Sequence, residues 1–291
     1  MALPAFDKLW DYDNPAATEG KFRALLSEAE KSEDRAYLAE LLTQLARTQG
    51  MQGHFDDAHA TLDRADKLID DATMPKARVR YLLERGRAFN SSDHPDQARP
   101  LFEKALELAS ANRLDAYAID GAHMLAIVEP SADGQLKWNY RAVAMAEKSD
   151  DPSARRWLAS LYNNIGCTLH DQKRYQDALE IFQKALKLRE AAGQKRQTRV
   201  ARYTTARTLR YLNRVDEALT MAQAIHADAK ADGETDPYVC EEIGEDLLLK
   251  NRAAEAAPFF KLAYEELSKD HWLEQHEPDR LKRLEGLSRQ K

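Results

Sequence analysis

Residues 161–190 read LYNNIGCTLHDQKRYQDALEIFQKALKLRE, two helical patterns separated by a short polar turn. In the first pattern Gly166 stands among large apolar residues that recur at steps of three and four. In the second, Ala178 is followed by Phe182 four residues on and by Ala185 three residues further. Side chains at these spacings share one face of a helix. The stretch therefore predicts a hairpin of two amphipathic helices.

The same pattern recurs along the chain with a period of 40 residues, and only the last step shortens to 38. The small residues of the first helices are Ala46, Gly86, Ala126, Gly166, Ala206 and Gly244. Twelve residues after each stands a member of the second helices, namely Ala58, Ala98, Trp138, Ala178, Ala218 and Ala256. The larger residues four further on include Leu62, Phe102, Phe182 and Phe260. A small residue allows two helices to approach closely, and the larger one fills the space beside it. The sequence thus predicts about six stacked hairpins.

This pattern resembles the tetratricopeptide repeat. The residues of the best copy that match the family's slots are Tyr162, Ile165, Gly166, Leu169, Ala178, Phe182 and Ala185. The family's usual period is about 34 residues, so the longer period here implies longer helices and resembles the branch seen in kinesin light chains. The resemblance implies an all-α fold, a right-handed α-α superhelix (solenoid) of about six helix hairpins with capping helices at both ends.

The resemblance also suggests how the chain is divided. We expect an N-terminal capping segment and helix over 1–33, six repeats over 34–270 and a C-terminal capping helix over 271–291. The third repeat departs most, with Trp138 in a small slot and an inserted turn at 129–131, so we expect a distorted hairpin there. The N-terminal phrase from Phe6 to Trp10 either caps the first hairpin or docks into a second molecule, and capping is favoured because the ends of a solenoid must cover their open core.

Composition narrows the classes of function. The chain has 43 Lys and Arg against 49 Asp and Glu, so a formal charge of -6 provides no global basic field for nucleic acid or an anionic membrane. Its two cysteines lie far apart and indicate neither a disulfide framework nor a zinc site. No segment has the length and apolar character of a signal peptide or a membrane span. A cytoplasmic location is the expectation.

Signatures of catalysis are missing from the sequence. It contains no GxGxxG, GxxxxGK[ST], HExxH or GxSxG motif. The close histidine pairs are spaced by five residues, off one helical face, and read as surface positions rather than metal ligands. Cys167 reads as a structural cysteine rather than a reactive thiol. We therefore expect no enzyme, no cofactor and no metal.

In the family that the chain resembles, the first helices line the concave side of the solenoid. Register relative to the small residues then gives the groove-facing side chains. The candidate peptide-binding residues are Asn163, Asn164, Tyr203, Arg207, Arg210, Arg47, Arg87 and His123.

One basic stripe lies among them. From 191 to 215 the chain has seven basic residues and no acid. Helical steps of three and four join Arg196, Arg199, Tyr203, Arg207, Arg210 and Arg214 into one stripe. Two readings stay open. In one, the stripe pairs with Glu241, Glu242 and Glu245 of the next first helix. In the other, Arg207 and Arg210, with Tyr203, Asn163 and Asn164, bind an acidic peptide or a chain terminus; binding of nucleic acid is the weakest option.

The sequence favours a non-enzymatic scaffold or adaptor that binds a peptide or protein segment in the groove of its repeats. The alternative is a regulatory sensor for a small anionic ligand or a signalling peptide. Neither the partner nor the oligomeric state follows from the sequence.

Overall fold

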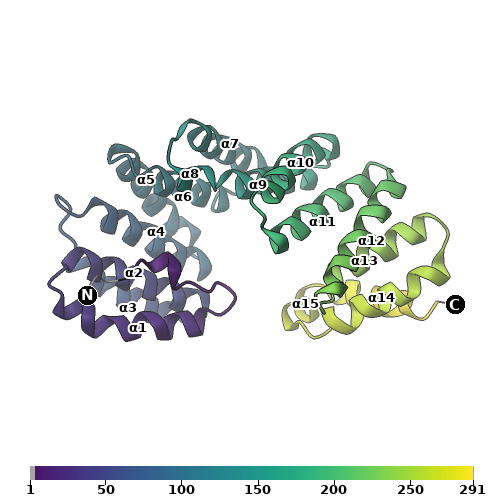
Figure 1. Cartoon of the computed structure of the whole chain (residues 1–291), viewed down its shortest axis with the longest axis horizontal. Helices are drawn as coiled ribbons and strands as arrows, with labels where there is room; N and C mark the ends of the chain where they lie inside the picture. The colour runs from purple at the N-terminus through teal and green to yellow at the C-terminus, as the bar shows by residue number, and fades with distance from the viewer. Residues whose placement is uncertain (1–3, 291) are drawn as a thin grey trace. The chain divides into compact units, whose positions relative to one another are not determined.

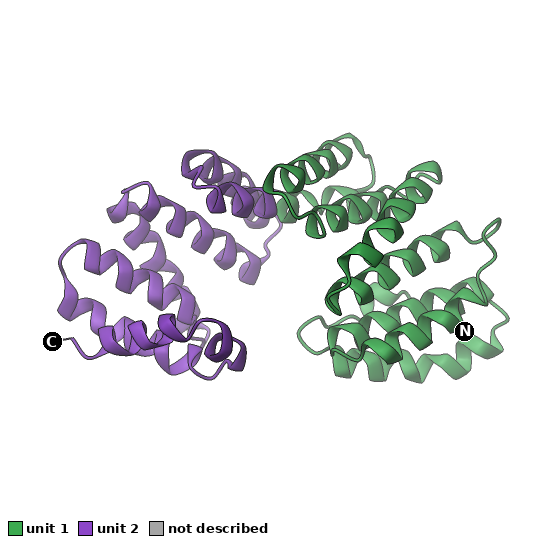
Figure 2. Ribbon diagram, turned by 180° about the vertical axis from the view of Figure 1, so that it is seen from behind, with its two compact units in different colours: residues 1–161 green, residues 162–291 purple. Residues whose placement is uncertain are grey.

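The computed structural model describes residues 4–290, and this part of the chain is helical throughout, with no strand. It divides into two compact units, residues 1–161 and 162–291 (Figures 1 and 2). Both are built from helix hairpins, as the repeat pattern predicts. The all-α, solenoid-type fold is thus confirmed.

Unit 1 begins with a short 3-10 helix, Phe6–Lys8, and α1 (Pro15–Lys31). Its hairpins pair α2 (Arg35–Met51) with α3 (Phe55–Asp66), α4 (Pro75–Ser91) with α5 (Pro95–Ala111), and α6 (Asp115–Ile127) with α7 (Ala132–Lys148). The one-turn helix α8 (Pro152–Arg155) follows, and the unit boundary falls within α9 (Leu158–Asp171).

Unit 2 continues with α10 (Tyr175–Ala191) and then alternates first and second helices in the same way. Its further hairpins pair α11 (Lys195–Tyr211) with α12 (Val215–Ala231), and α13 (Pro237–Leu249) with α14 (Ala253–Leu267). The last helices are α15 (His271–His276) and α16 (Pro278–Ser288), and α16 packs against α14. Its Leu284 is buried 40 residues after Gly244, so α16 occupies the position of one more first helix.

Close helix approach explains the small residues of the repeat. A Cβ atom added to Gly166 would lie 2.5 Å from Cε1 of Phe182, and one added to Gly244 would lie 2.7 Å from Cε1 of Phe260. Gly86 faces Phe102 in the same way. Where the first helix carries alanine instead, the second carries a smaller partner, as in the buried pairs Ala46 and Leu62, Ala126 and Ala142, and Ala206 and Ala222. The two helices therefore share a fixed volume, which glycine and phenylalanine or two smaller residues fill equally well.

The turns repeat with the same period. The residues with positive φ between paired helices are Gly53, Asp93, Lys173, Asn213 and Asn251, and those between hairpins are Glu33, Arg113, Gly193 and Gly233. A left-handed residue just beyond a helix lets its last carbonyls be satisfied. The third hairpin departs from this pattern, as its sequence predicts: α6 ends at Ile127, no described residue between α6 and α7 has a positive φ, and the Ser131 side chain caps α7 by accepting a hydrogen bond from the Gly134 N–H.

At the start of unit 1, the residues around the 3-10 helix pack on the first helices. Phe6 is buried against Phe22 and Tyr37, with ring centroids 6.1 and 4.8 Å away. The Trp10 indole N–H donates to Oε1 of Gln44 at 2.8 Å. Phe22 is fully covered as a result. None of the helices in the described part of the chain combines the length and the apolar character that a bilayer crossing requires.

Candidate functional site

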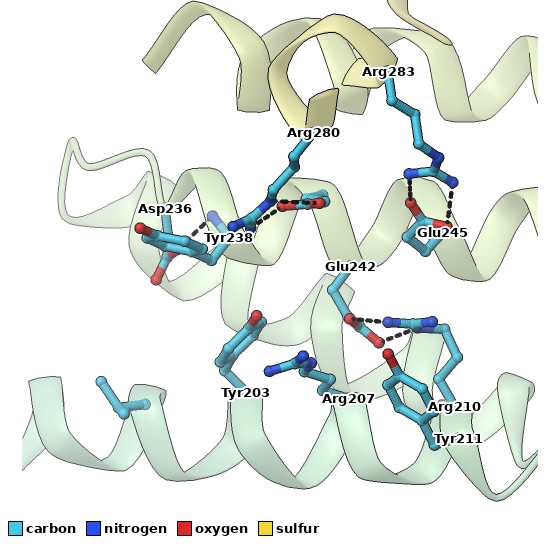
Figure 3. A pocket seen from close by; sticks show the side chains of 12 residues that line it. Tyr203, Arg207, Arg210, Tyr211, Asp236, Tyr238, Glu242, Glu245, Arg280 and Arg283 are labelled. Atoms are coloured by element: carbon cyan, nitrogen blue, oxygen red, sulfur yellow. Dashed lines mark hydrogen bonds and ion pairs between the residues drawn. The ribbon is translucent and has the colours of Figure 1, made fainter. Parts of the chain in front are cut away.

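Unit 2 contains a pocket of about 610 Å³ whose walls are three consecutive first helices, α11, α13 and α16 (Figure 3). Each of these helices presents a row of charged and aromatic side chains at steps of three and four. The lining residues are Val200, Tyr203, Arg207, Arg210, Tyr211, Asp236, Tyr238, Glu241, Glu242, Glu245, Arg280 and Arg283. Four arginines thus face four carboxylates, and three of the predicted site residues are brought together here.

Arg210 is held by Glu242. Its Nε donates to Oε1 at 2.7 Å and its Nη2 to Oε2 at 3.0 Å, a two-bond geometry in which both oxygens of the acid are used. Glu242 is only 3% exposed, so the pair is shielded from water. Although burial by itself lowers the pKa of Arg210, the hydrogen bonds and charge of Glu242 outweigh it and raise that pKa above its ordinary value.

The two remaining glutamates of α13 have partners on α16 instead of on the basic stripe. Arg280 binds Glu241, with Nε donating to Oε1 at 3.1 Å, and Arg283 binds Glu245, with Nη2 donating to Oε2 at 3.0 Å. The reading in which the stripe pairs with all three acids therefore holds for Arg210 and Glu242 alone. The arginines of α16 take the other two acids.

Three other arginines between residues 191 and 215 are also neutralised. Arg199 pairs with Asp232 and Glu234, and Arg202 pairs with Glu190 and Asp228. Arg214 pairs with Glu217 across one turn. These pairs lie outside the pocket, so the net positive charge seen in the sequence from 191 to 215 is spread over ordinary surface ion pairs.

Arg207 differs from the other pocket arginines. Its side chain is exposed, and within residues 4–290 it has neither an ion pair nor a hydrogen bond to a carboxylate. Its guanidinium stands 6.0 Å from the ring centre of Tyr211. Figure 3 shows Arg207 beside Tyr203 on α11, with no interaction drawn to it. Burial raises the pKa of Tyr203, so its phenol keeps its proton and can act as a hydrogen-bond donor.

Three other predicted residues lie in unit 1. Arg47 donates to Oε1 of Glu84 at 3.1 Å, and Arg87 donates to the same oxygen at 2.8 Å while also binding Asp120. His123 stands against the Trp157 ring at 5.4 Å, and burial lowers its pKa. Arg47 and Arg87 line a second pocket of about 280 Å³, but both are already paired with these carboxylates of unit 1.

Asn163 and Asn164 do not line either of these pockets. The Asn163 side-chain amide approaches the Cys167 sulfur at 3.8 Å, and the Asn164 carbonyl accepts from the Thr168 hydroxyl at 3.1 Å. Although Cys167 reaches solvent, partial burial raises the pKa of its thiol, which disfavours the reactive thiolate. The structure therefore does not join the two asparagines to Arg207 and Arg210.

Sequence reasoning missed the contribution of α16 and of the segment before α13. Asp236 caps α13 by accepting from the backbone N–H groups of Tyr238 and Val239, and the Arg280 guanidinium lies 5.5 Å from the Tyr238 ring centre. A signal for α16 was present: one further 40-residue step from Gly244 reaches Leu284, which predicts one more groove-lining helix.

Comparison with known proteins agrees with the geometry. A family model described as tetratricopeptide repeat matches residues 157–231. No curated protein sequence matches the chain. Among solved structures, a signal-transduction ATPase with a tetratricopeptide repeat sensor, from Pyrococcus horikoshii, has 17% identity and a TM-score of 0.72. The similarity covers 94% of this chain but only 44% of that one, so the chain spans less than half of the ATPase.

Two further structures show the same fold. A protein from Podosopora anserina with nearly identical kinesin-light-chain tetratricopeptide-like repeats has 16% identity and a TM-score of 0.53, over 68% of this chain and 98% of that one. The apo form of the quorum sensor NprR from B. thuringiensis has 15% identity and a TM-score of 0.58, over 96% of this chain and 88% of that one. Residues 157–231 thus match the tetratricopeptide-repeat family, and the likenesses to solved structures show that the chain has the fold of tetratricopeptide-repeat proteins, here with 40-residue hairpins.

Proposed function

We propose that the chain is a non-enzymatic interaction protein that binds an acidic peptide segment or chain terminus in the pocket formed by α11, α13 and α16. The observation that carries the proposal is the free charge of Arg207. Arg210, Arg280 and Arg283 each pair with a glutamate, which leaves Arg207 as the pocket cation available to a ligand. A guanidinium binds a carboxylate through two parallel hydrogen bonds.

The surroundings of Arg207 suit a peptide. Tyr203 offers a protonated phenol beside it, and the exposed ring of Tyr238 provides apolar surface across the pocket. Because the other arginines and glutamates of the pocket neutralise one another, a ligand carboxylate at Arg207 meets no broad basic surface. This arrangement supports recognition of one local negative charge and speaks against a nucleic-acid backbone, which needs several cations along a track.

A sensor of a small anionic ligand or a signalling peptide is the second candidate. The pocket volume of about 610 Å³ lies within the range of small-molecule sites, which is roughly 300–1,000 Å³. Two of the similar structures are described as a quorum sensor and as carrying a repeat sensor. Thermal stabilisation by metabolites such as citrate, without any peptide binding, would favour this candidate over the scaffold.

The test compares two libraries of fluorescein-labelled hexapeptides that differ only in a free or amidated carboxyl end. Fluorescence polarisation is measured with the full chain, with Arg207→Gln and with Arg214→Gln. The two substitutions remove the same charge from exposed positions of neighbouring sequence, but Arg214 lies outside the pocket and pairs with Glu217.

We expect acidic and free-ended peptides to bind best, and Arg207→Gln to weaken them by about 10- to 100-fold, since a charge-assisted hydrogen bond contributes roughly 1.5–3 kcal/mol. Arg214→Gln should change affinity by about twofold at most, because an exposed ion pair outside the pocket contributes little. Equal losses in both variants, or none in Arg207→Gln, would rule out the Arg207 pocket as the peptide site.

A further inference from the structure

Asp246 carries a buried carboxyl group close to Arg210, a residue that lines the pocket. It lies on α13 one helical turn after Glu242, and its side chain is completely covered. Neither carboxyl oxygen has a hydrogen-bond partner within the described residues. The nearest cation is Arg210, whose Nε lies 3.9 Å from Oδ1, beyond hydrogen-bonding distance.

The charged groups around Asp246 are already committed to other partners. From α11, Arg210 bonds both oxygens of Glu242. On α13, Glu245 is held by Arg283 of α16, and Lys250 at the end of the helix pairs with Asp216 of α12. A buried carboxylate without donors is strongly disfavoured. Burial, followed by the charge of Glu242, accordingly raises the pKa of Asp246 to about 8.

We propose that protonation of Asp246 controls anion binding in the Arg207 pocket. The pocket binds an anion while the Asp246 carboxyl is protonated, and it releases the anion when the carboxyl loses its proton to solvent. This inference rests on the proposed function, because it concerns the same pocket. It adds a regulator, protonation, that acts on a residue the ligand does not touch.

The coupling follows from the charges. With Asp246 neutral, Arg210 and Glu242 cancel, so Arg207 is the cation of the pocket without an ionic partner, while Asp236 accepts backbone N–H groups at the start of α13. Ionised Asp246 joins Glu242 beside the single guanidinium of Arg210, and the cluster becomes negative. Arg207 precedes Arg210 by three residues on α11, so the two lie on one face of the helix. The added charge opposes an incoming anion, and by linkage a bound anion favours protonation of Asp246.

The experiment uses inorganic sulfate as the probe, because its charge stays constant between pH 6 and 9. Sulfate affinity is measured by thermal-shift titration at pH 6.5, 7.5, 8.5 and 9 for the full chain, Arg207→Gln, Asp246→Asn and Asp246→Ala. The difference from Arg207→Gln isolates binding at the pocket from the general stabilisation that sulfate gives to folded proteins. In parallel, the Asp246 carboxyl is titrated by NMR in protein labelled with ¹³C-aspartate.

We expect Arg207-dependent affinity to fall on the order of tenfold between pH 6.5 and 9, with a midpoint near that of the Asp246 carboxyl, and to stay level in both Asp246 variants. Two variants are included so that one that folds poorly does not decide the outcome. If sulfate binding at pH 6.5 did not depend on Arg207, both the proposed anion site and the proton link would be disproved. Binding that is equal at every pH, a pH dependence that survives in Asp246→Asn, or an Asp246 carboxyl that titrates below pH 5 would overturn the proton link and leave the site standing.

Discussion

Replacing Gly166 by alanine tests the packing rule on which the repeat depends. The new Cβ would lie 2.5, 2.6 and 2.9 Å from Cε1, Cδ1 and Cζ of Phe182, about 1 Å inside an ordinary carbon contact. Phe182 is itself only 2% exposed and has little room to retreat. Overpacking of this kind costs roughly 1–3 kcal/mol. Alanine gains about 1 kcal/mol in helix propensity over glycine, so we expect a net destabilisation of up to about 2 kcal/mol.

Gly20 provides the matched control. It lies exposed within α1, and nothing stands within 4 Å of an added Cβ. Gly20→Ala should therefore stabilise the chain by about 0.5–1 kcal/mol. Urea denaturation of both variants measures the difference.

A rescue variant sharpens the test. Combining Gly166→Ala with Phe182→Leu copies the pair formed by Ala46 and Leu62, and it should recover about 1 kcal/mol relative to the sum of the single changes. If Gly166→Ala stabilised the chain as much as Gly20→Ala does, the shared-volume explanation of the repeat would be wrong.

Two further predictions concern stability. The folded chain holds the Asp246 proton up to about pH 8, whereas the unfolded chain loses it near pH 4. The free energy of unfolding should therefore fall as pH rises between these values, by at most about 1.4 kcal/mol per pH unit, and Asp246→Asn should lack this component. Urea denaturation from pH 5 to 9 measures it, and an equal pH dependence in the two proteins would contradict the buried, protonated state. Removal of residues 1–12 should uncover Phe22 and lower stability on the order of 3–5 kcal/mol, because the buried Phe6 ring and the half-buried Trp10 ring are lost with it. An unchanged melting temperature after truncation would indicate instead that the segment serves a second molecule.

The helix hairpins were predictable from the sequence because their cause is local and repeats. Close approach of two helices requires a small residue, and the volume that it leaves must be filled from the facing helix. A glycine at position 166 therefore predicts a large residue such as Phe182 16 positions later. The turns were less readable. Lys173 and Arg113 adopt positive φ although neither is glycine, because the flanking helices fix their conformation. The amino-acid type at these two positions therefore does not indicate a left-handed turn residue.

The site was predictable only in part. Register placed Tyr203, Arg207 and Arg210 on one face of α11, and in the structure all three line one pocket. It could not tell which arginine each glutamate would choose, since that depends on side-chain reach between helices. Asp246 gave no signal at all, because one acid among 49 becomes unusual only when the fold buries it.

The free charge of Arg207 has a cause that a comparison between repeats makes visible. Arg47 directly follows the small residue of its helix, and it binds Glu84, which stands two positions before the small residue of the next first helix. The equivalent pair in unit 2 would be Arg207 and Glu242. There, however, Arg210 has taken both oxygens of Glu242. In unit 1 the position equivalent to Arg210, three residues after Arg47, is Gly50, which has no side chain. Arg47 therefore keeps its bond to Glu84, which it shares with Arg87. The additional arginine on α11, Arg210, thus takes the glutamate that Arg207 would otherwise bind on the next first helix. Arg207 is left without an ion pair and can bind a ligand.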